Sequence, residues 1–147
     1  MLRIGQKVEG EVYKKRPSAY VIIERDEDEL VAIATDDEGT YFLLGGGIEA
    51  GESELDAIKR EVIEESGYSI YNIRLFDKLT SWSHSDRIGY LDVTATIFVA
   101  KFKEKISEPV ELDHKVMWVN PAEYVGKLYH EFQNYALEKY IEKKNNK

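Results

Sequence analysis

Cysteine is absent from this sequence of 147 residues. Its absence excludes disulfide bonds, thiolate nucleophiles and zinc–thiolate sites, and it suits a protein of the reducing cytoplasm. The sequence also has no run of about 18 apolar residues, so we expect no membrane-spanning helix. Residues 1–6 have no apolar core of the kind that a signal peptide needs. Together these absences favour a cytoplasmic protein without a membrane partner.

Positive charge is also scarce. The chain has 20 lysine and arginine residues against 28 aspartate and glutamate residues, which gives a formal net charge of −8. A protein with this balance is a poor candidate for binding nucleic acid through its overall field. The sequence contains no basic stripe either, so the decapping of RNA ends is disfavoured. From this charge balance we expect no nucleic acid partner.

The residues that are present are typical of a folded domain. Hydrophobic residues make up 43% of the chain and charged residues 33%, which excludes intrinsic disorder and collagen-like sequences. A length of 147 residues fits one domain with one core, so a single domain over 1–147 is predicted. Nothing in the sequence sets the oligomeric state, and a homodimer stays open.

Segments rich in β-branched and aromatic residues alternate with turns through most of the chain. They predict strands at 19–24, 30–35, 41–44, 69–75, 90–101 and 116–119, with a polar loop at 82–87. In the middle of the chain, Ser53 and Asp56 form a capping box and Gly67 suits a left-handed cap, which predicts a helix between them. Many strands with one central and one terminal helical region indicate the α+β class, a sandwich around a mixed sheet.

The C-terminal region is predicted to be helical. Asn120 can cap a helix that begins at Pro121, and Glu123 completes this start signal. The apolar stripe of the last helix is assigned to the core, and it consists of Phe132, Tyr135, Ala136 and Tyr140. The charged residues 142–147 are expected to form a frayed tail.

The predicted central helix carries closely spaced carboxylates. Glu61, Glu64 and Glu65 lie within one narrow arc of a helix with about 3.6 residues per turn. Taken alone, they would form a solvated helix face, in which like charges repel by about a few tenths of a kcal/mol per pair. A divalent cation would relieve this repulsion, and such oxygen ligands suit Mg²⁺ or Mn²⁺. Glu54 lies on the same arc and is assigned to the surface.

A glycine-rich loop precedes this helix. Gly45, Gly46 and Gly47 can bend sharply and bring backbone groups close to a polyphosphate. The N-terminus of the helix adds partial positive charge beside them. Arg60 supplies a planar, forked side chain next to Glu61, which suits holding that carboxylate in one orientation. The loop and the helix together therefore favour a phosphate and metal site.

The segment from Gly46 to Tyr68 resembles the signature of the Nudix (MutT-like) hydrolases. That signature reads Gly, five residues, Glu, seven residues, then Arg-Glu-aliphatic-any-Glu-Glu-any-Gly-apolar. Its seven fixed positions are all present in this chain: Gly46, Glu52, Arg60, Glu61, Glu64, Glu65 and Gly67. Leu44 stands where the family usually has proline, and Tyr68 where a smaller aliphatic residue is typical. Neither departure falls on a metal-binding position.

The resemblance implies a fold and an activity. The fold is an α/β/α sandwich with a mixed sheet between helices, and the activity is metal-dependent hydrolysis of a diphosphate linkage. The substrate would be a nucleoside diphosphate linked to another moiety, such as a nucleoside triphosphate or ADP-ribose, with Mg²⁺ or Mn²⁺ as the cofactor. Dinucleoside polyphosphates and nucleotide sugars share this linkage, so the signature does not select one substrate.

The resemblance also implies roles for individual residues. Glu64 and Glu65 would be the main metal ligands. Glu61 would be a further ligand or the base that activates water. Arg60 would orient Glu61, and Glu52 would brace the loop.

Further metal ligands would come from outside the helix. The backbone carbonyl of Gly46 could complete the metal shell. Family members often recruit another acid from a distant loop, and the candidates here are Glu111 and Asp113, ahead of Trp118. An ordinary acidic turn is an equally good interpretation of either residue.

A rival hypothesis is a Nudix-fold module that senses a nucleotide without turnover. A sensor has no need for a full metal cluster, so the presence of Glu61, Glu64 and Glu65 together favours the enzyme.

The remaining candidates are single polar or aromatic residues. Three histidines could serve substrate or water near neutral pH: His84, His114 and His130. Three cations are candidates for phosphate contact: Arg25, Lys78 and Arg87. For each of these, a plain surface or capping role is the more frequent one. Trp82 could stack on a base, although a half-buried packing role is the better interpretation.

Overall fold

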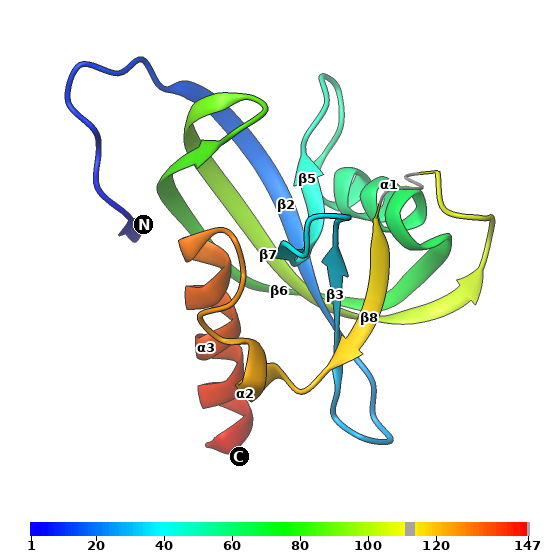
Figure 1. The fold of residues 1–147 in the computed structure, drawn as a ribbon. Helices are drawn as coiled ribbons and strands as arrows, with labels where there is room; N and C mark the ends of the chain where they lie inside the picture. The colour runs from blue at the N-terminus through cyan, green and yellow to red at the C-terminus, as the bar shows by residue number, and fades with distance from the viewer. Residues whose placement is uncertain (111–113, 147) are drawn as a thin grey trace.

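The computed structural model describes residues 1–110 and 114–146, which form one mixed sheet with helices packed against it (Figure 1). The strands are β1 (Arg3–Ile4), β2 (Lys14–Glu24), β3 (Val31–Thr35), β4 (Tyr41–Phe42), β5 (Leu44–Gly47), β6 (Tyr68–Ser85), β7 (Gly89–Lys105) and β8 (Lys115–Val119). The helices are α1 (Glu54–Ser66), α2 (Pro121–Tyr124) and α3 (Glu131–Asn145). None of the helices in these described ranges is long and apolar enough to cross a membrane.

Strand β2 lies in the interior of the sheet, and both of its edges are paired. Along one edge, residues 14–23 pair in parallel with residues 91–100 of β7. Along the other edge, β5 pairs with residues 18–21 and β3 pairs with residues 23–24, both antiparallel. The strand order is β1-β6-β7-β2-β3-β4, with β8 beside β3. The sheet is therefore mixed, as the sequence predicts.

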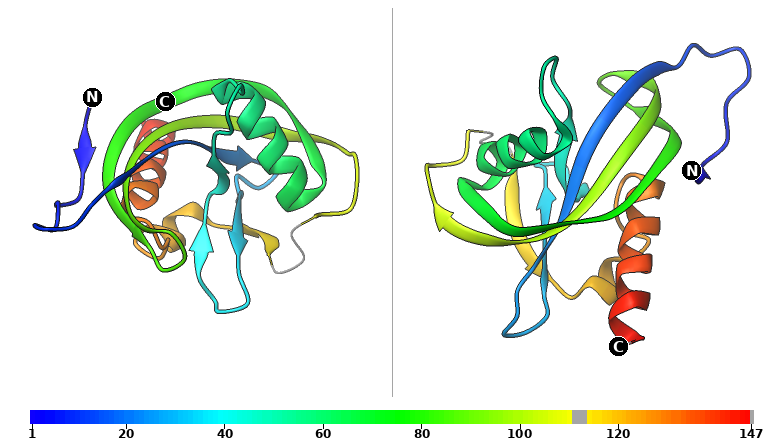
Figure 2. Two further views of the ribbon diagram at one scale, coloured as in Figure 1. Left: turned by 90° about the horizontal axis from the view of Figure 1, so that it is seen from above. Right: turned by 180° about the vertical axis from the view of Figure 1, so that it is seen from behind.

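The alternation of side chains along β2 divides the hydrophobic core into two layers. Tyr20 and Ile22 lie in the layer that α3 covers, whereas Val21 and Ile23 lie in the layer that α1 covers. The helices contribute buried residues to these layers, namely Ala57, Ile58 and Val62 from α1, and Phe132, Ala136, Leu137 and Tyr140 from α3. Figures 1 and 2 show the two helices on different sides of the long strands β2, β6 and β7. The predicted α/β/α sandwich is confirmed.

Local signals at the two ends of α1 act as predicted. The hydroxyl oxygen of Ser53 accepts a hydrogen bond from the backbone N–H of Asp56 at 3.0 Å. At the other end, Gly67 adopts the left-handed conformation with φ of 80°. Its N–H donates to the carbonyl of Ile63 at 2.8 Å. These caps fix where α1 begins and ends, and thereby which of its residues face β5.

The hairpin of β6 and β7 is longer than predicted. The strand expected to end at residue 75 continues to Ser85, and the polar loop expected at 82–87 is reduced to residues 86–88. Trp82 pairs with Asp92 across the hairpin and packs edge-on against Tyr13, with 4.9 Å between the ring centroids. Polar residues can extend this ladder because an antiparallel hairpin tolerates water on one face.

The C-terminal region begins as predicted but continues differently. The side chain of Asn120 accepts a hydrogen bond from the backbone N–H of Ala122 at 3.1 Å and caps α2. That helix ends at Tyr124, and α3 is a separate helix that includes residues 142–145, where a frayed tail was expected. Within the predicted apolar stripe of α3, Tyr135 is only partly buried, whereas its three companions belong to the core.

Replacing Gly67 with alanine tests the left-handed cap. Besides the unfavourable φ, the added Cβ would overlap the carbonyl oxygen of Ser107. We expect Gly67→Ala to lower the free energy of unfolding by about 3 kcal/mol or more, measured by denaturant titration. Gly51→Ala is the matched control because Gly51 has a φ of 83° and no atom within 4 Å of an added Cβ. Its cost should be about 1 kcal/mol, and equal costs in the two variants would refute the contact with Ser107 as a constraint.

Candidate active site

Strand β5 brings the glycine segment against the acidic helix α1. The backbone N–H of Gly45 donates to Oε1 of Glu65 at 2.8 Å. A Cβ built on Gly46 would lie 2.7 Å from Oε1 of Glu61, so any side chain at this position would collide with that carboxylate. With glycine at this position, the backbone of β5 lies against the Glu61 carboxylate without moving it.

Arg60 is the centre of a network of charged groups. Its Nε and Nη2 atoms donate to the carboxylate of Glu52 at 2.7 and 3.0 Å. Its Nη1 donates to Glu61 at 3.0 Å and to Glu64 at 3.2 Å. The hydrogen bonds with Glu52 raise the pKa of Arg60 and hold the pKa of Glu52 below its usual value. The Nη2 atom also donates to the carbonyl of Gly47 at 3.1 Å, so one guanidinium joins the helix to the glycine segment.

The carboxylates of α1 differ in their exposure and in their partners. Glu65 is buried at 6% exposure, and the side chain of Glu61 is 12% exposed. The side chain of Glu64 is 34% exposed and is held by Arg60. Glu54 pairs instead with Nζ of Lys78 at 3.1 Å, consistent with the surface role expected for it.

The predicted metal ligands on α1 share contacts with Arg60, but they do not form a complete metal-binding group. Among residues 1–110 and 114–146, no three acidic or histidine side chains are close enough to hold a metal ion. The Nη1 atom of Arg60 contacts both Glu61 and Glu64, and Glu65 is turned to the N–H of Gly45. Nevertheless, carboxylate oxygens beside a glycine backbone are the donors that a hard divalent cation prefers. The candidates Glu111 and Asp113 lie outside the described residues.

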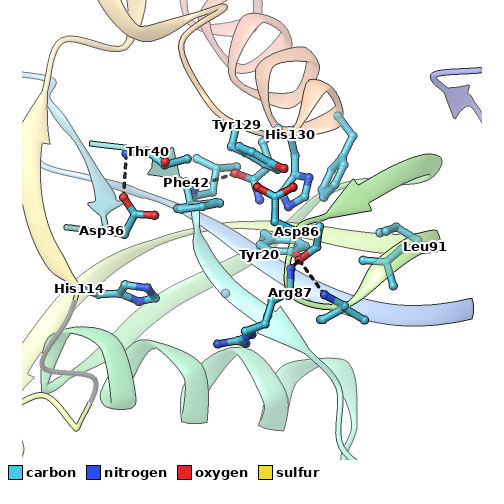
Figure 3. Close-up of a pocket in the computed structure, with 18 of the residues that line it drawn as sticks. Tyr20, Asp36, Thr40, Phe42, Asp86, Arg87, Leu91, His114, Tyr129 and His130 are labelled. Carbon is cyan, nitrogen blue, oxygen red and sulfur yellow. Dashed lines mark hydrogen bonds between the residues drawn. The ribbon is translucent and has the colours of Figure 1, made fainter. Parts of the chain in front are cut away.

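A cavity of about 540 Å³ opens beside this network (Figure 3). Gly45, Gly46 and Glu65 form part of its wall, whereas the turn between β3 and β4 and the turn between β6 and β7 form its rim. A cluster of aromatic rings contributes another wall, with ring centroids of Phe42 and Tyr129 5.8 Å apart and those of Tyr129 and His130 4.9 Å apart. The volume is typical of a site for a small molecule, for which roughly 300–1,000 Å³ is common.

The three histidines and Trp82 line two neighbouring cavities, and His130 lines both of them. His114 and His130 line the large cavity, whereas Trp82 and His84 line a neighbouring hollow of about 210 Å³. Burial, followed by the positive charge of Arg16, lowers the pKa of His130 to about 4, so its ring is neutral at pH 7. Trp82 is half-buried, in agreement with its expected packing role.

The cations that the sequence singled out mostly lie elsewhere. Arg25 pairs with Asp28 at 2.7 Å, and Lys78 is engaged by Glu54. Only Arg87 of the three lines the cavity, where its side chain is exposed in the turn between β6 and β7.

Sequence reasoning missed Arg16 and Tyr20, which line the cavity from β2. The guanidinium of Arg16 reaches the glycine segment, since a Cβ built on Gly47 would lie 3.1 Å from its Cζ. Burial raises the pKa of the Tyr20 hydroxyl, and the nearby charges of Glu65 and Glu61 act in the same direction. Arg16 comes shortly before the apolar run at 19–24 and Tyr20 lies within it, so no local signal in the sequence distinguishes them.

Gln133 of α3 is the other cavity residue that the sequence did not reveal. It is fully buried, and its Oε1 accepts the backbone N–H of Leu43 at 2.7 Å. Its Nε2 atom is buried and has no hydrogen-bond partner among the described residues. A buried donor of this kind is uncommon in folded proteins. The only signal for it in the sequence is a polar residue next to an apolar stripe.

Several known proteins resemble this chain in sequence. An RNA pyrophosphohydrolase of Ruthia magnifica subsp. Calyptogena magnifica is 31% identical over 103 residues, which cover 70% of this chain and 51% of that protein. The chain thus spans about half the length of that relative. A nucleoside triphosphatase NudI of Escherichia coli O139:H28 is 28% identical over 127 residues, which cover 84% of this chain and 81% of that protein.

Structural and family comparisons agree with these relatives. A MutT structure from work on Aliivibrio salmonicida and Vibrio cholerae superimposes with a TM-score of 0.68 and 20% identity, covering 88% of this chain and 99% of that one. This likeness supports the fold. The sequence model described as the NUDIX domain matches residues 14–140. The chain therefore belongs to the Nudix family.

Proposed function

We propose that this protein is a Mg²⁺-dependent pyrophosphohydrolase that cleaves the diphosphate linkage of a nucleoside diphosphate joined to another moiety. A nucleoside triphosphate and ADP-ribose are examples of such substrates, and Mn²⁺ could replace Mg²⁺. The observation that carries the proposal is the contact between the glycine segment and the acidic helix at the wall of the cavity, where the backbone of Gly46 lies against the carboxylate of Glu61. The names of the relatives, a pyrophosphohydrolase and a nucleoside triphosphatase, support it.

The proposed metal ligands are the three carboxylates of α1 and one backbone oxygen, namely Glu61, Glu64, Glu65 and the carbonyl of Gly46. A bound cation would supply positive charge to offset the charge that gathers on the phosphoryl oxygens. The chain itself supplies the rigid frame, because Glu52 both holds Arg60 and accepts the backbone N–H of Glu49 at 2.8 Å. The loop and the helix thereby keep one relative position.

The two arginines of the site would have different tasks. The charge of Arg60 is already shared by Glu52, Glu61 and Glu64, so it is suited to positioning carboxylates. Arg16 makes no ion pair with any described residue and lines the cavity, so its charge is available to an anionic substrate. The overall charge of −8 and the acidic residues in the cavity wall are then no objection, because a bound divalent cation would invert the local field for an anionic substrate.

The rival hypothesis is a sensor that binds a nucleotide without turnover. A second alternative is action on RNA ends, which the acidic balance disfavours although one relative is named as an RNA pyrophosphohydrolase. Both alternatives can be separated from the proposal by the same screen.

The screen measures product formation from nucleoside triphosphates, ADP-ribose, dinucleoside polyphosphates, nucleotide sugars and 5′-triphosphorylated RNA, with Mg²⁺ and with Mn²⁺. We expect turnover of at least one small nucleotide, with products cut at the diphosphate linkage, and its loss when EDTA is added. Tight binding of a nucleotide with no turnover across the panel would support the sensor. Turnover of the RNA alone would overturn the small-molecule assignment.

Replacing Arg60 with lysine tests its positioning role. Lysine keeps the charge but lacks the planar fork that reaches Glu52, Glu61 and Glu64 together. We expect Arg60→Lys to remain folded and to lose about tenfold to a thousandfold in kcat, the scale of a mispositioned catalytic group.

The matched control for this change is Arg74→Lys on β6, because Arg74 pairs with Glu24 at 3.0 Å and does not line the cavity. Turnover by the control should equal that of the parent. Full activity in Arg60→Lys would mean that the guanidinium geometry does not matter.

A further inference from the structure

Arg16 stands apart from most other arginines of this chain. Arg3, Arg25, Arg60 and Arg74 each pair with a carboxylate at 3.0 Å or less. The side chain of Arg16 has no ion pair or hydrogen bond with any residue in the described ranges, although it is half-buried. A partly buried charge without a partner is unfavourable, and acidic residues outnumber basic ones in this chain. A bound anion would supply the missing partner.

The position of Arg16 indicates which anion this is. It lies on β2 two residues before Ser18, which pairs with Gly47 of β5, and it lines the same cavity as Gly46 and Glu65. Its charge contributes, after burial, to the lowered pKa of His130, which places the guanidinium near the aromatic wall of the cavity. An anion bound to Arg16 would therefore lie inside the cavity beside the glycine segment.

The aromatic wall of the cavity is suited to the uncharged part of a nucleotide. Phe42, Tyr129 and His130 gather on one wall and offer flat rings to a base (Figure 3). The amide of Gln133 has a fixed orientation, because the N–H of Leu43 can only donate and must face its oxygen. Its Nε2 donor has no partner among the described residues but is shielded from solvent, so the base is assigned to the aromatic wall and not to this amide.

We propose that Arg16 receives the phosphate attached to the nucleoside and holds it independently of the metal. The cavity would then bind a nucleoside monophosphate by itself, with the phosphate at Arg16 and the base toward the aromatic wall. This inference rests on the proposed function for its biological meaning, since the monophosphate would be the half of the substrate that stays in the cavity after cleavage. A guanidinium and a phosphate form charge-assisted, often bidentate hydrogen bonds, which lysine does not reproduce.

The test is calorimetric titration in EDTA of the whole chain with AMP, GMP, CMP and UMP, with adenosine and with inorganic phosphate. We expect at least one monophosphate to bind and adenosine to bind much more weakly. Arg16→Met should weaken that binding by about ten- to a hundredfold, the loss expected for hydrogen bonds to a charged group. Arg16→Lys should lie between the parent and Arg16→Met.

The matched control is Lys15→Met, which removes an exposed cation of the same strand that does not line the cavity. It should leave monophosphate binding within about twofold of the parent. The melting temperature of Arg16→Met should equal or exceed that of the parent, because the change removes an unpaired charge. A marked fall in melting temperature would instead assign Arg16 a structural role and overturn the proposal.

Three other outcomes would also overturn it. These are unchanged monophosphate binding in Arg16→Met, equal binding of inorganic phosphate and monophosphates, and no binding of any monophosphate at millimolar concentration. Because metal and turnover are absent from this titration, its result is separate from that of the hydrolysis screen. Arg16-dependent binding in a protein that hydrolyses nothing would leave this inference standing and refute the proposed hydrolase.

Discussion

The arrangement of the site depends on one guanidinium that neutralises a crowded acidic surface. Arg60 contacts Glu52, Glu61 and Glu64 and also the carbonyl of Gly47, so it joins the start of the loop to the middle of α1. Without such a cation, carboxylates three and four residues apart would repel each other. The same contacts hold the glycine segment against the helix, and the packing of Gly46 on Glu61 follows from this.

The sheet adds what the helix and the loop cannot supply. Because β2 pairs with β5 in one register, Arg16 and Tyr20 face the same cavity as Gly46. Because α3 packs on the opposite layer from α1, its first turns bring His130 and Gln133 to that cavity from the other side. The site therefore combines an acidic end, formed by α1 and the glycine segment, with an aromatic end that α3 completes from the other layer of the sandwich.

Features with local signals could be predicted from the sequence, and features that depend on register could not. Ser53, Gly67 and Asn120 act as caps because capping involves residues within one turn of the helix. Contacts of Arg60 with its helix neighbours follow in the same way from spacing. By contrast, the role of Arg16 depends on strand pairing, and that of Gln133 on how α3 docks. The polar end of β6 was misread as a loop because an exposed hairpin and a loop have similar compositions. The metal site, the cytoplasmic location and a homodimer stay predictions.

The central claim is that the acidic face of α1 binds a divalent cation. Melting curves in EDTA and in millimolar Mg²⁺ for the parent, Glu64→Gln and Glu65→Gln test it most directly, with Glu54→Gln as the control because Glu54 pairs with Lys78 instead. A ligand that binds only the folded state at a hundredfold excess over its Kd adds about 2.7 kcal/mol. The account predicts a Mg²⁺-dependent rise in melting temperature for the parent and the control, and loss of most of that rise in the other two variants. Equal rises in all four proteins would contradict it and return these glutamates to a solvated helix face.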